Sequence, residues 1–237
     1  MPPELSRSRR PQHAVVERIA LHNPETRSIF LRLPAEQGLT FSPGQFISLQ
    51  LPVGGETLIR PYSIASNPEE SELLEICLNR VPGGVGSAYL FTLRAGAVVH
   101  FSGPWGTFVV AEPPVGECVF IADATGVAPI RPMLKRILSR GSNGSVRLHY
   151  RADAVDELLY RGEWEAAERE HGRFQFEPLL DRSPYALLQS VRARYVDGDA
   201  ERDRHFFICG VGDVVTKLRD LLRGAGYQRR AVQYEKW

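Results

Sequence analysis

The sequence predicts a two-domain protein, with an antiparallel β-barrel or β-sandwich followed by a doubly wound α/β domain that has a parallel sheet. Short apolar runs broken by turn residues fill the first half of the chain, which is typical of antiparallel strands. From residue 116 onward, apolar runs alternate with stretches of helical periodicity. The pattern changes at Pro113-Pro114. We therefore expect a β domain over 13–112 and an α/β domain over 116–237, after a disordered lead-in at 1–12.

Five short runs in the first domain are predicted strands. In the third of them the apolar side chains of Ile47, Leu49 and Leu51 alternate with polar ones and would share one face. Clusters of glycine, proline and asparagine separate the runs and would form the turns. The predicted strands are 15–19, 28–33, 46–51, 73–78 and 97–101.

The second domain begins with a continuous apolar run, Cys118–Ala122, as expected for a buried parallel strand. Apolar residues from Ile130 to Leu138 then follow the spacing of one helix face. The alternation continues to the end of the chain, and the last helix should end at Gly224 or Gly226. The predicted strands are 118–122, 146–150, 174–179, 205–209 and 231–234, and the predicted helices are 130–138, 164–169, 185–195 and 214–222.

Composition narrows the classes of function. There are 29 basic and 28 acidic residues, so a dedicated nucleic-acid binder is not expected. No apolar run approaches the roughly 18 residues of a membrane span, and residues 1–12 do not resemble a secretory signal. Cys77, Cys118 and Cys209 lie too far apart in the sequence for the spacing of a zinc or iron–sulfur site, and an odd, sparse set of cysteines argues against a disulfide scaffold. We expect no metal and a cytoplasmic location. The structural alternative for each cysteine is a small buried apolar residue.

The segment Arg60-Pro61-Tyr62-Ser63 resembles the flavin-binding motif of the ferredoxin–NADP reductase superfamily. An arginine fork can pair with a diphosphate, and a tyrosine ring can stack on an isoalloxazine. The resemblance implies that these four residues bind FAD, with the Ser63 hydroxyl bonded to the flavin N5, where hydride arrives. An ordinary strand end is the structural alternative.

A glycine-rich turn about 20 residues later opens a short helical pattern. Backbone N–H groups at a helix N-terminus attract an anion. The turn resembles the flavin-pyrophosphate loop of the same superfamily, with Ser87 as a hydroxyl donor, whereas the alternative is a flexible hairpin loop. The residues implied to bind the cofactor are Gly84, Val85, Gly86 and Ser87.

The segment 123–129 follows a predicted strand and precedes a helix, the position at which a doubly wound fold binds a dinucleotide diphosphate. It resembles the nucleotide-binding segment of the superfamily. Asp123 and Ala124 stand where glycine is common, and the Asp123 carboxylate would oppose a phosphate. The residues implied to bind the nucleotide are Thr125, Gly126 and Pro129.

Two further segments resemble the superfamily's hydride-transfer site. Cys209-Gly210 resembles a Cys-Gly motif whose thiol borders the nicotinamide, although the usual proline is absent. The chain ends in Glu-x-aromatic, which implies that Trp237 covers the flavin face that the nicotinamide needs and that Glu235 is a polar partner near Ser63. The expected catalytic residues are therefore Ser63, Cys209, Glu235 and Trp237. The structural alternatives are that Cys209 is a core residue and that the chain ends in a solvated terminus.

The segment 179–184 follows a strand, where the adenosine ribose would lie, and resembles Leu-Asp-Arg-x-Pro of NADH-preferring members. The Asp181 carboxylate can accept hydrogen bonds from a 2′-hydroxyl and repels a 2′-phosphate. Arg182 and Arg151 carry positive charges that would instead attract the 2′-phosphate of NADPH. We expect NADH to be slightly favoured over NADPH, although Asp181 could merely cap the following helix.

Taken together, the resemblance covers residues 14–237 and implies a Greek-key FAD barrel followed by a Rossmann-like NAD(P)H domain. It implies an enzyme of electron transport that moves hydride from NAD(P)H to bound FAD and electrons to a separate acceptor. That acceptor would be a ferredoxin, a flavodoxin or an oxygenase component, because no cysteine cluster for an iron–sulfur domain is present. Three alternatives stay open: a diffusible-flavin reductase, a non-catalytic FAD- and nucleotide-binding regulatory subunit, and FMN in place of FAD.

Overall fold

The computed structural model describes residues 12–70, 72–110, 116–141 and 144–237. The chain divides into two compact units, one of residues 1–111 with 131–133 and the other of residues 112–130 with 134–237. The predicted lead-in and the predicted boundary at 113–114 lie outside the described residues, except for Gln12. That residue belongs to the first strand and not to a disordered segment.

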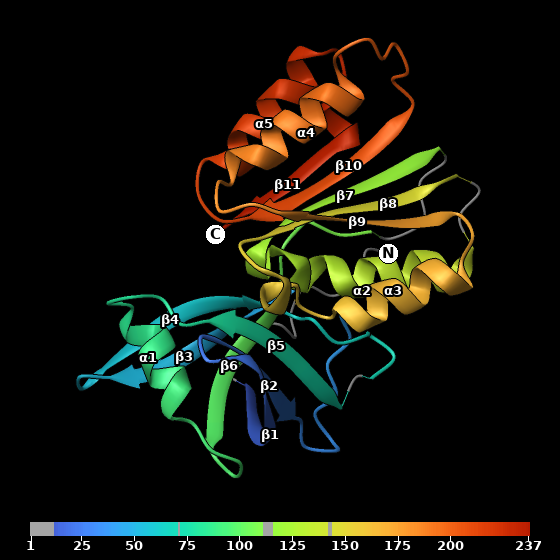
Figure 1. The fold of residues 1–237 in the computed structure, drawn as a ribbon. Helices are drawn as coiled ribbons and strands as arrows, with labels where there is room; N and C mark the ends of the chain where they lie inside the picture. Colours follow the sequence, from blue (N-terminus) through green and yellow to red (C-terminus); the bar gives the residue numbers. More distant parts are fainter. Residues whose placement is uncertain (1–11, 71, 111–115, 142–143) are drawn as a thin grey trace. The chain divides into compact units, whose positions relative to one another are not determined.

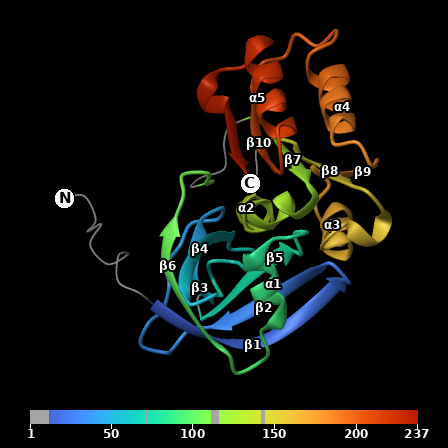
Figure 2. The same cartoon turned by 90° about the vertical axis from the view of Figure 1, so that its left-hand side faces the viewer.

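The first unit is an antiparallel six-stranded sheet in the order β4-β3-β6-β1-β2-β5 (Figures 1 and 2). An antiparallel bridge pairs Ile64, the residue after β4, with Ile76 in the middle of β5. Because β4 and β5 are the two outermost strands of the sheet, this bridge closes it into a barrel. This confirms the predicted antiparallel barrel. The strands are β1 (Gln12–Asn23), β2 (Thr26–Arg32), β3 (Phe46–Val53), β4 (Glu56–Ser63), β5 (Leu73–Asn79) and β6 (Val98–Trp105).

The interior of the barrel contains the alternating apolar face that the sequence predicted. Ile47, Leu49 and Leu51 on β3 are fully buried. Helix α1 (Val85–Thr92) packs beside β3 and contributes Leu90 to the same core. One strand, β4, was not predicted. Most of its side chains are exposed, so it lacks the apolar alternation by which the other strands were recognised.

The second unit is a parallel five-stranded sheet in the order β11-β10-β7-β8-β9. This confirms the predicted doubly wound domain. Helices α2 and α3 cover one face, and α4 and α5 cover the other (Figure 1). The strands are β7 (Glu117–Asp123), β8 (Val146–Ala152), β9 (Phe174–Leu180), β10 (Arg204–Gly210) and β11 (Val232–Lys236). The helices are α2 (Val127–Arg140), α3 (Arg161–Glu170), α4 (Tyr185–Tyr195) and α5 (Val214–Gly224).

The strand order places the chain reversal between β7 and β10. From β7 the chain adds β8 and β9 on one side, and then returns to add β10 and β11 on the other. In such sheets ligands bind outside the carboxyl ends of the strands at this reversal. The stacked rings of Phe120 and Phe207, whose centroids are 4.9 Å apart, join the two strands in the middle of the sheet. None of the helices in the described ranges has the length and apolarity that a membrane crossing requires.

Candidate active site

The end of β4 carries the predicted flavin motif. Pro61 lies on β4, the outermost strand in the strand order, and proline is tolerated on such strands although it has no N–H to donate. Arg60 is exposed, and its Nη1 donates to the Ile59 carbonyl at 2.9 Å. Tyr62 is half-buried, and burial raises the pKa of its hydroxyl to about 12, against the opposing charge of Arg60. The phenol therefore stays protonated at neutral pH.

The hydroxyl of Ser63 has an unusual environment. Its Oγ is buried, and among the residues that the structure describes it has no hydrogen-bond partner. A buried polar group without a partner costs about 1–3 kcal/mol. A ligand with a polar atom at this position would remove that cost.

The glycine-rich turn lies directly beside this motif. A Cβ added to Gly86 would lie 3.4 Å from Cγ of Arg60 and 3.4 Å from Cδ1 of Leu51. Helix α1 starts at Val85, and no side chain caps it, so the N–H groups of its first turn are suited to an anion. The structure thus brings the predicted diphosphate-binding arginine and the predicted phosphate loop together.

Ser87 holds the turn in place. Its hydroxyl donates to the Gly84 carbonyl at 3.0 Å and accepts from the Val81 N–H at 3.0 Å. Its side chain is therefore already engaged within the loop, and its predicted contact with a phosphate stays a prediction. Gly83 adopts a positive φ of 71°, which glycine tolerates and most residues do not.

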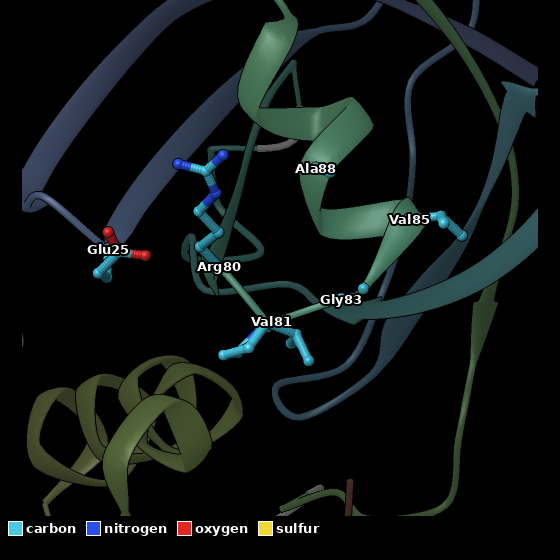
Figure 3. Close-up of a pocket in the computed structure, with 8 residues that line it drawn as sticks. Glu25, Arg80, Val81, Gly83, Val85 and Ala88 are labelled. Carbon is cyan, nitrogen blue, oxygen red and sulfur yellow. The ribbon is translucent and has the colours of Figure 1, made fainter.

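A cavity of about 400 Å³ adjoins the turn (Figure 3). Arg80 and Glu25 supply its charged side chains, and the Arg80 guanidinium also lies 5.6 Å from the centre of the Phe91 ring. This cavity was not predicted, because Glu25 and Arg80 are 55 residues apart and neither belongs to a recognisable motif. The cavity is lined by Glu25, Arg80, Val81, Pro82, Gly83, Gly84, Val85 and Ala88.

In the second unit, the predicted nucleotide segment meets the end of β10 at the chain reversal. A Cβ on Gly126 would lie 2.2 Å from the Cys209 carbonyl oxygen, and a Cβ on Gly210 would lie 2.7 Å from Cβ of Asp123. Only glycine fits at these two positions. Because glycine has no Cβ, the backbone of the nucleotide segment can approach the backbone at the end of β10 this closely. Thr125 is half-buried, and Pro129 is buried in the first turn of α2, where its missing N–H is not needed.

The predicted catalytic residues of this unit lie together at the carboxyl ends of β10 and β11. Cys209 pairs with Glu235 in the parallel register. Burial, and then the nearby Glu235 carboxyl, raise the pKa of the Cys209 thiol, so it stays protonated. Burial also raises the pKa of Glu235 to about 7. Within the described ranges, Oε1 of Glu235 has no hydrogen-bond partner.

The end of the chain is held in place. The Trp237 N–H donates to the Gly210 carbonyl at 3.1 Å, and the Gly212 N–H donates to the Trp237 carbonyl at 3.4 Å. The tryptophan is half-buried. The alternative of a freely solvated terminus therefore does not describe this segment.

The predicted ribose-binding residues lie at the ends of β8 and β9. Asp181 and Arg182 are exposed, and Oδ1 of Asp181 accepts from the Ser183 N–H at 2.7 Å. No side chain caps α4, whose N-cap residue is Pro184, so Asp181 does not act as the helix cap. Arg151 is buried in a network of contacts with its neighbours, which the sequence did not indicate.

Comparison with known proteins identifies the family. Residues 13–110 match the model of the oxidoreductase FAD-binding domain, and residues 120–219 match that of the oxidoreductase NAD-binding domain. The chain is 30% identical to ferredoxin–NADP reductase B of Sorangium cellulosum over 226 residues, which cover 91% of this chain and 93% of that protein. It therefore belongs to the ferredoxin–NADP reductase superfamily.

Further relatives agree. The reductase subunit of an aromatic O-demethylase from Amycolatopsis is 33% identical over 68% of this chain and 48% of that protein, so the chain spans about half of that relative. A cytochrome P450 reductase of Amycolatopsis has a TM-score of 0.82 at 27% identity, covering 96% of this chain and 69% of that one. A ferredoxin NADP+ reductase of Neisseria gonorrhoeae, solved with bound FAD and NADP, shares the fold at 21% identity with a TM-score of 0.79, covering 96% of this chain and 98% of that one.

These findings confirm the predicted class. The chain is a FAD-dependent NAD(P)H oxidoreductase that passes electrons to an acceptor.

Proposed function

We propose that this chain takes hydride from NADH, transfers it to FAD held by the barrel, and supplies electrons to a separate protein in the cytoplasm. The acceptor would be a ferredoxin, a flavodoxin or an oxygenase component. The relatives named ferredoxin–NADP reductase and aromatic O-demethylase reductase subunit support this class of acceptor. The observation that carries the proposal is the buried, unpartnered hydroxyl of Ser63 at the end of β4.

The residues of the barrel fit FAD. Arg60 and the uncapped N-terminus of α1 would hold the diphosphate. The Tyr62 ring would lie against the flavin ring system, and Oγ of Ser63 would bond to a polar atom at its edge. When bound, FAD supplies the redox chemistry, because it accepts a hydride from the reduced nicotinamide and releases electrons to an acceptor.

The cavity beside the turn supports FAD rather than FMN. It lies on the loop that would hold the diphosphate, and it is lined by one basic side chain, Arg80, and one acidic side chain, Glu25 (Figure 3). We assign this cavity to the adenosine end of the cofactor, a group that FMN lacks. FMN would leave a cavity of about 400 Å³ unfilled.

The second unit would hold the nicotinamide nucleotide. Gly126 is the N-cap residue of α2 and no side chain caps this helix, so the N–H groups of its first turn would face a diphosphate bound at the chain reversal. Cys209, Glu235 and Trp237 lie together at the ends of β10 and β11. We propose that the neutral thiol and the carboxyl orient the nicotinamide, and that Trp237 occupies the place of the nicotinamide until the nucleotide binds.

The role of Ser63 is tested by replacing it with alanine. Ser63→Ala should retain FAD and slow flavin reduction by NADH about 10- to 100-fold, because a hydrogen bond aimed at the reacting ring is lost. The measurement is stopped-flow absorbance under anaerobic conditions. Ser66→Ala is the matched control, since the Ser66 hydroxyl accepts from the Glu75 N–H at 3.0 Å within the fold. Equal reduction rates in Ser63→Ala and the unaltered protein would refute the assigned role.

A further inference from the structure

Arg151 connects three strand ends of the second unit. Its Nε donates to the Asp181 carbonyl at 2.7 Å, its Nη1 pairs with Oδ1 of Asp123 at 2.9 Å, and its Nη2 pairs with Asp153. The residue is only 6% exposed. Because β7, β8 and β9 are neighbours, a single guanidinium links the end of β7, the end of β8 and the loop that follows β9.

The contacts leave Arg151 little charge to offer a ligand. Asp123 is buried, and burial raises its pKa while the pair with Arg151 opposes that rise. The Asp123 carboxylate is therefore neutralised by an arginine and does not oppose a phosphate as the sequence alone indicated. The remaining carboxylates, Asp153 and Asp181, are both exposed at this edge. Arg182, which follows Asp181, is also exposed, so the two carboxylates outnumber the one free cation among these described residues, and an added phosphate would meet a net negative charge here.

We infer that Arg151 is a positioning residue for the nucleotide and that Asp153 is a specificity-determining residue. Arg151 fixes the backbone of Asp181, so the Asp181 carboxylate is held where it can accept from a ribose 2′-hydroxyl. Asp153 engages the outer nitrogen of Arg151 and adds a negative charge beside it. The site therefore selects the unphosphorylated ribose of NADH over the 2′-phosphate of NADPH, an inference that rests on the proposed use of a nicotinamide nucleotide.

The role of Asp153 is tested by ligand binding, independently of turnover. The probes are adenosine 5′-monophosphate and adenosine 2′,5′-bisphosphate, titrated into the holoprotein by calorimetry. Asp153→Asn should improve binding of the bisphosphate relative to the monophosphate about three- to tenfold, because one repulsive charge is lost and Arg151 regains a free donor. Asp156→Asn is the matched control, since Asp156 is exposed in the same loop. No change in Asp153→Asn, or an equal change in Asp156→Asn, would overturn the inference.

The role of Arg151 is tested by Arg151→Lys, which keeps a positive charge near Asp123 but loses the fork that reaches three partners. The KM for NADH should rise about tenfold with little change in kcat, because the lost hydrogen bond to the Asp181 carbonyl loosens the ribose site. The preference for NADH over NADPH should shrink as well. A merely structural role would lower the yield of folded protein without changing the ratio of the two KM values.

If Arg151→Lys does not fold, the double variant Asp123→Asn with Arg151→Gln replaces both buried charges at once. The same loss of NADH preference is expected. A wild-type preference in either folded variant would overturn the positioning role. Failure of the proposed function itself would look different, since the unaltered protein would then oxidise neither NADH nor NADPH with any artificial acceptor.

Discussion

Ala124 has a backbone conformation that is unfavourable for alanine. Its φ is +49°, which costs an L-residue with a side chain about 1–2 kcal/mol. It stands immediately after β7, where the superfamily commonly has glycine. Ala124→Gly should therefore raise the free energy of unfolding by relieving this strain. Because glycine also loses more conformational entropy on folding than alanine, the net gain should be at most about 1 kcal/mol.

Chemical denaturation measures this effect. The control is Ala128→Gly, the same substitution inside α2, which should lower the free energy of unfolding by about 1 kcal/mol. Destabilisation by both substitutions would show that the left-handed backbone at residue 124 carries no strain.

Glu235 should make the stability of the protein depend on pH. Burial raises its pKa from the usual 4.5 to about 7, so between these values the folded chain binds a proton that the unfolded chain has lost. The contribution of Glu235 to the free energy of unfolding is therefore most favourable below about pH 4.5. This contribution falls by up to about 3 kcal/mol as the pH rises through 7.

Glu235→Gln should remove this part of the pH dependence. Between about pH 5 and pH 8, the free energy of unfolding of the variant should therefore fall less than that of the unaltered protein. Denaturant titrations at several pH values measure the difference. Glu170→Gln, at an exposed position at the end of α3, should keep the original slope. Identical slopes in all three proteins would mean that the Glu235 carboxyl is not desolvated.

At the scale of elements, the position of the residue that follows β11 can be tested separately. The backbone of Trp237 is bound to Gly210 and Gly212, so this residue is held next to the end of β10, where Cys209 lies. If the ring occupies the place of the nicotinamide, its displacement costs free energy each time NADH binds. Trp237→Ala should then tighten nucleotide binding up to about tenfold, given the usual energy of an aromatic contact.

Fluorescence or calorimetric titration with NAD+ measures this change in affinity. Lys236→Ala is the matched control, because Lys236 is the exposed residue immediately before Trp237, at the end of β11. Unchanged affinity in Trp237→Ala would show that the terminal aromatic does not obstruct the site.

The elements differ in how well the sequence predicted them. The strands with one buried face, such as β3, and the continuous apolar strand β7 were recognised because burial dictates their pattern. Strand β4 was missed because most of its side chains are exposed, although it carries the flavin motif at its end. The cavity at Arg80 and the links of Arg151 were also missed, since their partners come from distant parts of the chain.

At the scale of the whole molecule, the chain combines two units with separate tasks. The barrel offers an arginine, an uncapped helix and an unpartnered hydroxyl to a flavin. The parallel sheet offers a glycine-lined chain reversal to a nucleotide diphosphate. The family follows from both units together, because the two matched domain models cover them in this order.

The central claim is that the barrel holds FAD and that NADH reduces it. The most direct measurement is the visible absorption spectrum of the purified protein during an anaerobic titration with NADH, with the cofactor released by heating identified afterwards. We predict flavin bands at about 380 and 450 nm that bleach as NADH is added, and FAD in the supernatant. A colourless protein that speeds the reduction of added flavin would contradict the claim in favour of a diffusible-flavin reductase, and a colourless, inactive protein would contradict catalysis altogether.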